Sequence, residues 1–258
     1  MADYRNVPDP ELVAGRGLFI AEGRLVVTRL LASDRFVVRS VLLTEAAYAS
    51  VRRSIDARPD VPVYLVSQDI MNAITGFNIH RGCLALGQRP PAHGWRELAA
   101  ASRTLLVLER VGDADNVGSL FRNAVALGAD AVLLGPGCAD PLYRKAIRTS
   151  MGAALTMPFA PVADWPQALQ ELRAAGWSTI ALTPDRSATV VYDIGTAMRG
   201  RRCAVVVGHE GDGLAAASLA MCEHRVRIPM AAGTDSLNVA TAAAVALYEI
   251  GRGRGEGA

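Results

Sequence analysis

The chain has 258 residues, of which 51% are hydrophobic and 20% charged. This composition excludes a disordered chain and provides enough apolar surface for one large domain or two modest ones. The net charge of +2 is too small to indicate nucleic-acid binding by itself, and an aromatic content of 5% excludes a surface built mainly for stacking single-stranded bases. Any contact with RNA would depend on arginine, because Lys145 is the sole lysine among 27 basic residues.

The cysteines are widely spaced and form no C-x-x-C pair with a nearby histidine, so the sequence predicts no metal site. The N-terminal stretch has no apolar signal core, and no apolar run is long enough to span a bilayer. We therefore expect a cytoplasmic protein with reduced thiols and no membrane partner.

The N-terminal part predicts a small α/β domain. An amphipathic helix is expected over 22–31, and short apolar strands over 36–43, 61–66 and 82–86. Two prolines and a glycine then interrupt regular structure in 88–94. We expect a domain over 1–87, a linker over 88–101, a second domain over 102–252 and a flexible tail over 253–258.

The second domain predicts a parallel-sheet α/β structure. Its strand-like runs, at 104–108, 131–134, 178–182, 204–207 and 225–228, are continuously apolar, as strands covered on both faces require. Helical patterns fall between or after them, at 116–127, 141–150, 165–175 and 236–250.

The first segment with chemical potential joins the strand 104–108 to the helix that follows it. Carboxyl ends of strands are where open α/β sheets collect ligands. Asn116 is interpreted either as an N-cap or as a ligand-binding amide. Arg122 lies in an otherwise apolar helix, so it either has an anionic partner or extends along the helix to reach solvent.

The second segment is the glycine-rich stretch 208–213, which follows the strand 204–207. Glycines there let backbone groups approach a ligand closely. Glu210 is interpreted either as a ligand contact or as an acceptor that ties down the turn. His209 is interpreted as a turn residue rather than a catalytic base, because no second group is visibly placed to orient it.

The third segment, 227–240, runs from a strand through small residues into a helix. Ser236 or Asp235 would serve as the N-cap of that helix. Asn238 is not explained by capping at either position, and an amide in an apolar first turn indicates a specified partner.

Together these segments resemble the SpoU/TrmH family of the SPOUT methyltransferase superfamily. The family's motifs N-x-G-x-x-x-R, G-x-E-G-x-G and I-P-M followed by S-L-N-V are met in order; we call them the first, second and third motif. They fall on Asn116, Gly118 and Arg122; on Gly208, Glu210, Gly211 and Gly213; and on Ile228, Pro229, Met230, Ser236, Leu237, Asn238 and Val239. His209 and Ala240 depart from the residues common at those positions, Asn, Ser or Ala for the former and Ser for the latter.

The resemblance extends to other parts of the chain. Residues 148–153 look like the S-x-G-A segment of the family, and residues 17–23 and 79–86 look like the ribosomal-L30e-like substrate-binding domain that many members carry. The resemblance implies a trefoil knot in the second domain, which is rare among folds. It also implies a homodimer in which the first-motif helix lies near the partner.

The activity implied by the resemblance is transfer of a methyl group from S-adenosylmethionine to a ribose 2′-hydroxyl of RNA. The implied cofactor-binding residues are Thr183, Gly208, Glu210, Gly211, Ile228, Met230, Leu237 and Asn238, and the implied catalytic residues are Asn116, Arg122, Glu210, Ser236 and Asn238. A guanidinium gives up its proton only at strongly basic pH, so a general base is an unsuitable role for Arg122. Our hypothesis is that Arg122 binds the phosphate beside the target nucleotide and stabilises the developing alkoxide.

Ribosomal RNA is the expected target, because members with the L30e-like extension often act on it. The alternatives are a tRNA 2′-O-methyltransferase and a non-catalytic RNA-binding member of the fold. A nucleotide-dependent oxidoreductase built on 135–137 is disfavoured, because that stretch lacks a third glycine and Pro136 has no backbone N–H to donate.

Overall fold

The computed structural model describes residues 2–5, 8–75, 82–198 and 200–252. The chain forms two compact units: unit 1 comprises Met1–Pro91 and Asp140–Thr156, and unit 2 comprises Ala92–Ala139 and Met157–Ala258. The division after Pro91 falls within the expected linker 88–101. The units differ from the expected domains in two ways: 140–156 belongs with the N-terminal part, and the linker contains helix α4 (Trp95–Ala101). This helix forms because Trp95 and Ala99 bury one face in the core of unit 2.

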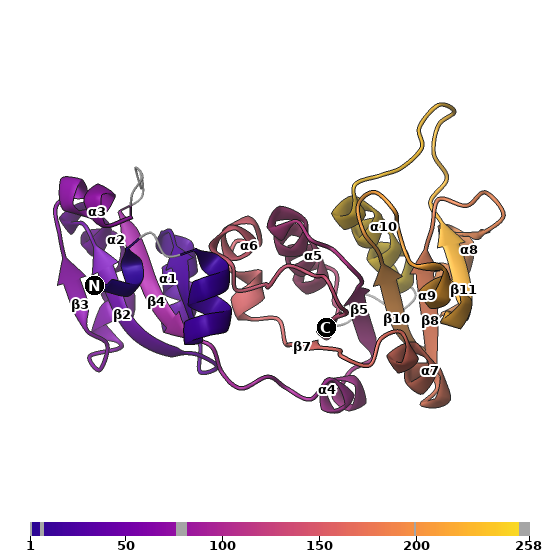
Figure 1. The fold of residues 1–258 in the computed structure, drawn as a ribbon, viewed down its shortest axis with the longest axis horizontal. Helices are drawn as coiled ribbons and strands as arrows, with labels where there is room; N and C mark the ends of the chain where they lie inside the picture. The colour runs from indigo at the N-terminus through magenta and orange to yellow at the C-terminus, as the bar shows by residue number, and fades with distance from the viewer. Residues whose placement is uncertain (1, 6–7, 76–81, 199, 253–258) are drawn as a thin grey trace. The chain divides into compact units, whose positions relative to one another are not determined.

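Unit 1 is built on a four-stranded mixed sheet in the order β1-β4-β2-β3 (Figure 1). Strand β4 is antiparallel to β1 and β2, and β3 is parallel to β2. The bounds are β1 (Leu18–Glu22), β2 (Val37–Leu43), β3 (Val63–Leu65) and β4 (Cys83–Gln88), with helices α1 (Arg24–Leu31), α2 (Glu45–Asp56) and α3 (Gln68–Thr75), a π-helix at Glu11–Gly15 and a 3₁₀ turn at Ala2–Tyr4. The predicted strands are confirmed. The predicted helix begins at Arg24 rather than Glu22, because Glu22 still pairs within the sheet.

The segment Asp140–Thr156 joins unit 1 through helix α6 (Arg144–Thr149), which packs against β1, and a 3₁₀ turn at Ala153–Leu155. The Asp9 carboxylate accepts hydrogen bonds from the backbone N–H and the Nε of Arg144, both at 2.9 Å. Asp140 forms an ion pair with Arg89. Helix α6 is shorter than the predicted 141–150. The likeness of unit 1 to an L30e domain stays a prediction, and residues 79–81 and the tail 253–258 lie outside the described residues.

Unit 2 contains a seven-stranded sheet, parallel throughout, in the order β7-β6-β5-β10-β8-β11-β9. The predicted parallel α/β class is confirmed, and the knot stays a prediction. The bounds are β5 (Thr104–Leu108), β6 (Ala131–Leu134), β7 (Phe159–Pro161), β8 (Trp177–Leu182), β9 (Thr189–Val190), β10 (Arg202–Val207) and β11 (His224–Arg227). The short strands β7 and β9 were not predicted.

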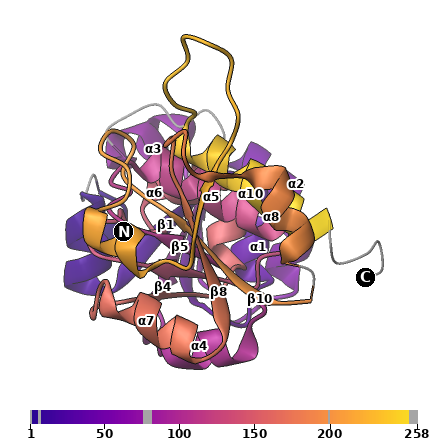
Figure 2. The ribbon, with the colours of Figure 1, turned by 90° about the vertical axis from the view of Figure 1, so that its right-hand side faces the viewer.

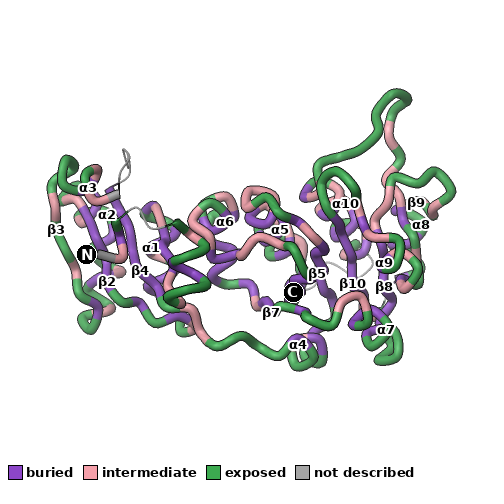
Figure 3. The backbone as a smooth tube through the Cα atoms, viewed as in Figure 1, coloured by how far each residue is buried: buried purple, intermediate pink, exposed green. Residues whose placement is uncertain are grey.

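Helices cover both faces of this sheet (Figure 2). On one face, Leu169 and Leu172 of α7 (Gln167–Ala174) share a core with Leu105 and Val107 of β5 and with α4, and α9 (Ala216–Met221) packs beside α7. On the other, α5 (Ala114–Ala126), α8 (Val191–Ala197) and α10 (Val239–Arg252) pack together. Strands β5, β6, β8 and β10 are buried almost throughout, whereas β11, β9 and the connection from β11 to α10 are largely exposed or half-buried (Figure 3). Within the described ranges, no helix is long and apolar enough to cross a bilayer.

Candidate functional site

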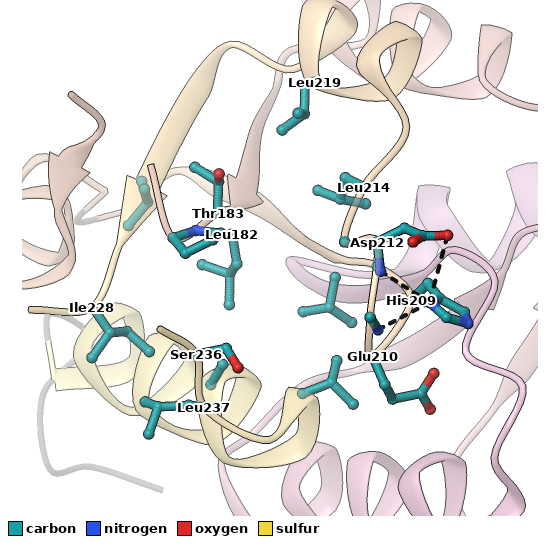
Figure 4. Close-up of a pocket in the computed structure, with 18 of the residues that line it drawn as sticks. Leu182, Thr183, His209, Glu210, Asp212, Leu214, Leu219, Ile228, Ser236 and Leu237 are labelled. Carbon is teal, nitrogen blue, oxygen red and sulfur yellow. Dashed lines mark hydrogen bonds and ion pairs between the residues drawn. The ribbon is translucent and has the colours of Figure 1, made fainter. Parts of the chain in front are cut away.

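A pocket of about 310 Å³ lies at the carboxyl edge of the central strands of unit 2 (Figure 4). Its walls come from the segments that follow β8, β10 and β11 and from the start of α10. The expected cofactor residues that line it are Thr183, Gly208, Glu210, Gly211, Ile228, Met230 and Leu237, and Ser236 joins them. Asn238 does not line the pocket, although its neighbours in the sequence, Leu237 and Val239, do.

The second motif forms a tight turn that closes on itself. The backbone groups of His209 and Gly213 exchange hydrogen bonds of 3.1 and 3.0 Å. His209 Nδ1 accepts hydrogen bonds from the backbone N–H groups of Gly211 (3.0 Å) and Asp212 (3.1 Å), as its interpretation as a turn residue requires (Figure 4). A Cβ on Gly208 would stand 2.4 Å from the Gly213 carbonyl carbon, so only glycine allows this turn to approach the strand end.

One residue from each motif joins a chain of hydrogen bonds beside the pocket. Asn116 Nδ2 donates to Glu210 Oε1, and Asn238 Nδ2 donates to Asn116 Oδ1, both at 2.8 Å. Glu210 therefore contacts Asn116 rather than the backbone of its own turn. Segments about 94 and 122 residues apart in the sequence are tied together at one point.

The N-caps of α5 and α10 are neither Asn116 nor Ser236 or Asp235, the candidates that residue type offered. Asp113 caps α5 by accepting from the Asp115 N–H at 2.7 Å, which leaves Asn116 in the first turn with its amide directed to the other motifs. Asn238 caps α10, because its Oδ1 accepts from the N–H groups of Ala240 (2.9 Å) and Thr241 (3.3 Å). Helix α10 consequently begins at Val239, three residues later than predicted, and Ser236 remains on the pocket wall.

Arg122 does not join this cluster. It is exposed on α5 and makes no hydrogen bond or ion pair with any residue that the structure describes. Helical geometry of about 100° per residue places it roughly 120° around α5 from Asn116, so the two side chains leave different faces. Within one chain, Arg122 reaches the surface, and no anionic partner is present among the described residues.

Glu109 and Arg110 were not identified from the sequence, yet they hold the far end of the second motif. Glu109 is 1% exposed and accepts from the Ala215 N–H, while Arg110 Nη2 donates to the Gly213 carbonyl at 3.3 Å. The available signal was a carboxylate directly after the four consecutive apolar residues 105–108 of β5, a run that indicates burial. Such a group requires compensating donors.

A thiol also lies in this region of unit 2. Burial raises the pKa of the nearby Cys138 thiol to about 11, so it is protonated at neutral pH and does not act as a nucleophile. Among the described residues, no group of three or more His, Cys, Asp or Glu side chains could hold a metal ion.

A parallel sheet with a glycine-walled pocket at its carboxyl edge defines a ligand-binding α/β domain. The model of the SpoU rRNA Methylase family matches residues 103–248. An uncharacterized tRNA/rRNA methyltransferase of Mycobacterium tuberculosis is 48% identical over 251 residues, which cover 96% of this chain and 86% of the relative. The chain therefore belongs to the SpoU rRNA methylase family and is an RNA methyltransferase.

Two further proteins are informative about this family. The 23S rRNA (guanosine(2553)-2'-O)-methyltransferase RlmP of Bacillus subtilis is 29% identical, with 90% of this chain and 88% of RlmP covered. The AdoMet-bound rRNA methyltransferase of Sinorhizobium meliloti superposes with a TM-score of 0.80 at 25% identity, with 97% of this chain and 93% of that chain covered.

Proposed function

We propose that the protein transfers a methyl group from S-adenosylmethionine to a ribose 2′-hydroxyl of ribosomal RNA. The observation that carries the proposal is the chain Glu210–Asn116–Asn238, which brings one polar residue from each motif to the side of the pocket. The similarity to RlmP supports the 2′-O-ribose reaction and the ribosomal target. The AdoMet-bound relative supports the cofactor.

The pocket fits a cofactor with an apolar and a polar part. Leu182, Ile228 and Leu237 supply apolar walls, and the glycine turn presents backbone groups that no Cβ shields. We assign binding to the residues on these walls: Thr183, Gly208, Glu210, Gly211, Ile228, Met230 and Leu237. When bound, S-adenosylmethionine supplies an electrophilic methyl group. We assign Asn238 to holding Asn116 and the start of α10 rather than to the pocket wall.

The polar residues of the chain orient the acceptor. Asn116, Glu210 and Asn238 hold one another in fixed positions, and Ser236 adds a hydroxyl on the pocket wall. Such a fixed set suits the alignment of a ribose hydroxyl, because displacement at a methyl carbon depends on the angle of attack. Arg122 binds the adjacent phosphate and stabilises the developing alkoxide.

The position of Arg122 supports a homodimer in which each Arg122 serves the pocket of the other protomer. The Arg122 side chain is exposed and leaves α5 on a different face from Asn116, so it does not point to the site that Asn116 joins in the same protomer. A two-fold dimer would repeat this relation in both sites.

Complementation between two inactive variants tests this arrangement. We expect Arg122→Ala and Asn238→Ala homodimers each to be inactive. In a mixed dimer, action in trans leaves one site with both residues intact, so mixing restores activity. If Arg122 instead acts within its own protomer, every site of the mixed dimer lacks one of the two residues and mixing restores no activity. That result would overturn the proposal that Arg122 serves the pocket of the other protomer.

The cofactor and target are tested separately. Calorimetric titration with S-adenosylmethionine is expected to show binding, whereas no binding at millimolar cofactor would favour the non-catalytic RNA-binding alternative. Mapping of 2′-O-methyl sites in total RNA with and without the gene is expected to show loss of an rRNA mark. Loss of a tRNA mark instead would favour the alternative target.

A further inference from the structure

Glu109 is a buried carboxylate at the carboxyl end of the central strand β5, outside the set of residues assigned to cofactor or RNA. Both of its oxygens are used. Oε2 accepts from the indole Nε1 of Trp165 at 2.9 Å, and Oε1 accepts from the backbone N–H of Ala215 at 2.8 Å. The same indole N–H also lies 3.2 Å from the hydroxyl of Ser218, which is 1% exposed.

These contacts fall at the point where the glycine turn becomes α9. Ala215 is the N-cap residue of α9, and Leu214 on the pocket wall immediately precedes it. Arg110 adds a second contact two residues before Ala215, where its side chain donates a hydrogen bond to the Gly213 carbonyl. Arg110 has a φ of 55°, a strained conformation for a residue with a side chain, and its Nε lies 3.7 Å from Glu109 Oε1.

We propose that Glu109, held by Trp165, is a positioning residue that fixes the exit of the second motif and so keeps the pocket in its cofactor-binding shape. The start of the motif is already fixed, because Gly208 directly follows β10. The turn itself is short and exposed, so the position of Glu210 depends on how both ends are held. This inference rests on the proposed function for the identity of the ligand. The role of Glu109 can also be measured in the cofactor-free protein, where no ligand is needed.

Two substitutions weaken these contacts: Glu109→Gln keeps the side-chain volume, and Trp165→Phe reduces it by the same amount as its matched control. Glu109→Gln leaves one acceptor oxygen, which can satisfy the Ala215 N–H or the Trp165 indole but not both. Trp165→Phe removes the indole donor. Trp177→Phe is the matched control, because Trp177 is 2% exposed in the same core and its Nε1 has no hydrogen-bond partner among the described residues.

The first measurement is amide hydrogen exchange in the cofactor-free protein. Glu109→Gln is expected to accelerate exchange of the Ala215 N–H by about tenfold or more, because one neutral oxygen, for which the Ala215 N–H and the Trp165 indole compete, replaces a charged acceptor. Trp165→Phe is expected to accelerate it by about threefold, since the carboxylate loses the donor that holds it. Trp177→Phe is expected to leave it unchanged. Unchanged exchange in both test variants, or equal acceleration in the control, would overturn the inference.

The second measurement separates positioning from a general loss of folded protein. Both test variants are expected to raise the Kd and the KM for S-adenosylmethionine by about tenfold or less, with kcat at saturating cofactor within about twofold of wild type. A fall in kcat with an unchanged KM would indicate fewer folded molecules and would contradict the inference. Absence of binding by the wild-type protein would refute the proposed function alone, because the exchange experiment tests Glu109 independently.

Discussion

At the scale of single residues, Asn238 has two tasks that one substitution can separate. Its Oδ1 caps α10, and its Nδ2 donates to Asn116. Asn238→Asp keeps an oxygen for the cap and loses the donor, whereas Asn238→Ala loses both. We expect Asn238→Ala to lower the free energy of unfolding by about 1 kcal/mol and Asn238→Asp to leave it nearly unchanged, because aspartate is an equally good N-cap.

Activity should depend on the hydrogen bond that Asn238 donates to Asn116. Both variants are expected to lose most of kcat in single-turnover methylation, because neither can hold Asn116 and, through it, Glu210. Thermal unfolding measured in parallel gives the stability. Wild-type activity in Asn238→Asp would show that the bond to Asn116 is dispensable for the reaction.

The sequence predicted which residues gather at the site better than it predicted their tasks. Motif residues from three segments do line or flank one pocket. Residue type could not identify the N-caps, because Asp, Asn and Ser have nearly equal capping preference, so Asp113 and Asn116, or Ser236 and Asn238, are indistinguishable. The choice depends on a partner 122 residues away, which periodicity does not report.

At the scale of elements, the approach of the glycine turn to β10 makes a prediction about side-chain volume. Gly208→Ala places a Cβ 2.4 Å from backbone atoms of Gly213, which cannot move without opening the turn. We expect loss of measurable binding of S-adenosylmethionine in calorimetric titration. Gly112→Ala is the control: its Cβ meets its nearest atom at 3.9 Å, so binding should be retained. Binding by Gly208→Ala at wild-type affinity would contradict the assignment of this pocket.

The attachment of α6 to unit 1 makes a second prediction. Asp9 and Arg144 are 20% and 17% exposed in their side chains, and Asp9 accepts two hydrogen bonds. Asp9→Ala is expected to cost about 2 kcal/mol of stability, because it removes the carboxylate that accepts both the backbone and the side-chain hydrogen bond of the largely buried Arg144. Asp60→Ala, which removes an ion pair from a side chain 63% exposed, should leave the melting temperature unchanged. Equal effects in thermal unfolding would contradict the importance of the buried pair.

Long apolar strands were predictable because burial on both faces demands continuous apolar sequence, as in β5 and β6. The two residues of β9 and the three of β7 carry too little pattern for this, whereas the three-residue β3 was predictable because it lies within the longer apolar run 61–66. Helix α4 was hidden by the prolines just before it, although Trp95 and Ala99 mark its buried face.

At the scale of the whole molecule, the membership of 140–156 in unit 1 could not be predicted from the sequence. The segment follows β6 and precedes β7, so chain order places it with the second domain. Its attachment depends on contacts such as Asp9 with Arg144, 135 residues apart. Local patterns identify a helix there but not the core against which it packs.

The two units have separate cores, and buried cysteines report on each. Burial raises the pKa of Cys83 in unit 1 and of Cys222 in unit 2 to about 12, so both thiols are protonated and slow to alkylate at pH 8 until local structure opens. If unit 2 alone binds S-adenosylmethionine and the units unfold independently, cofactor at 100 times its Kd should slow labelling of Cys222 by about a hundredfold and leave Cys83 unchanged. Iodoacetamide labelling followed by peptide mass spectrometry measures both rates in one sample. Equal slowing of the two cysteines would mean that the units unfold as one, whereas slowing of neither would mean that Cys222 is labelled through an opening that leaves the pocket intact.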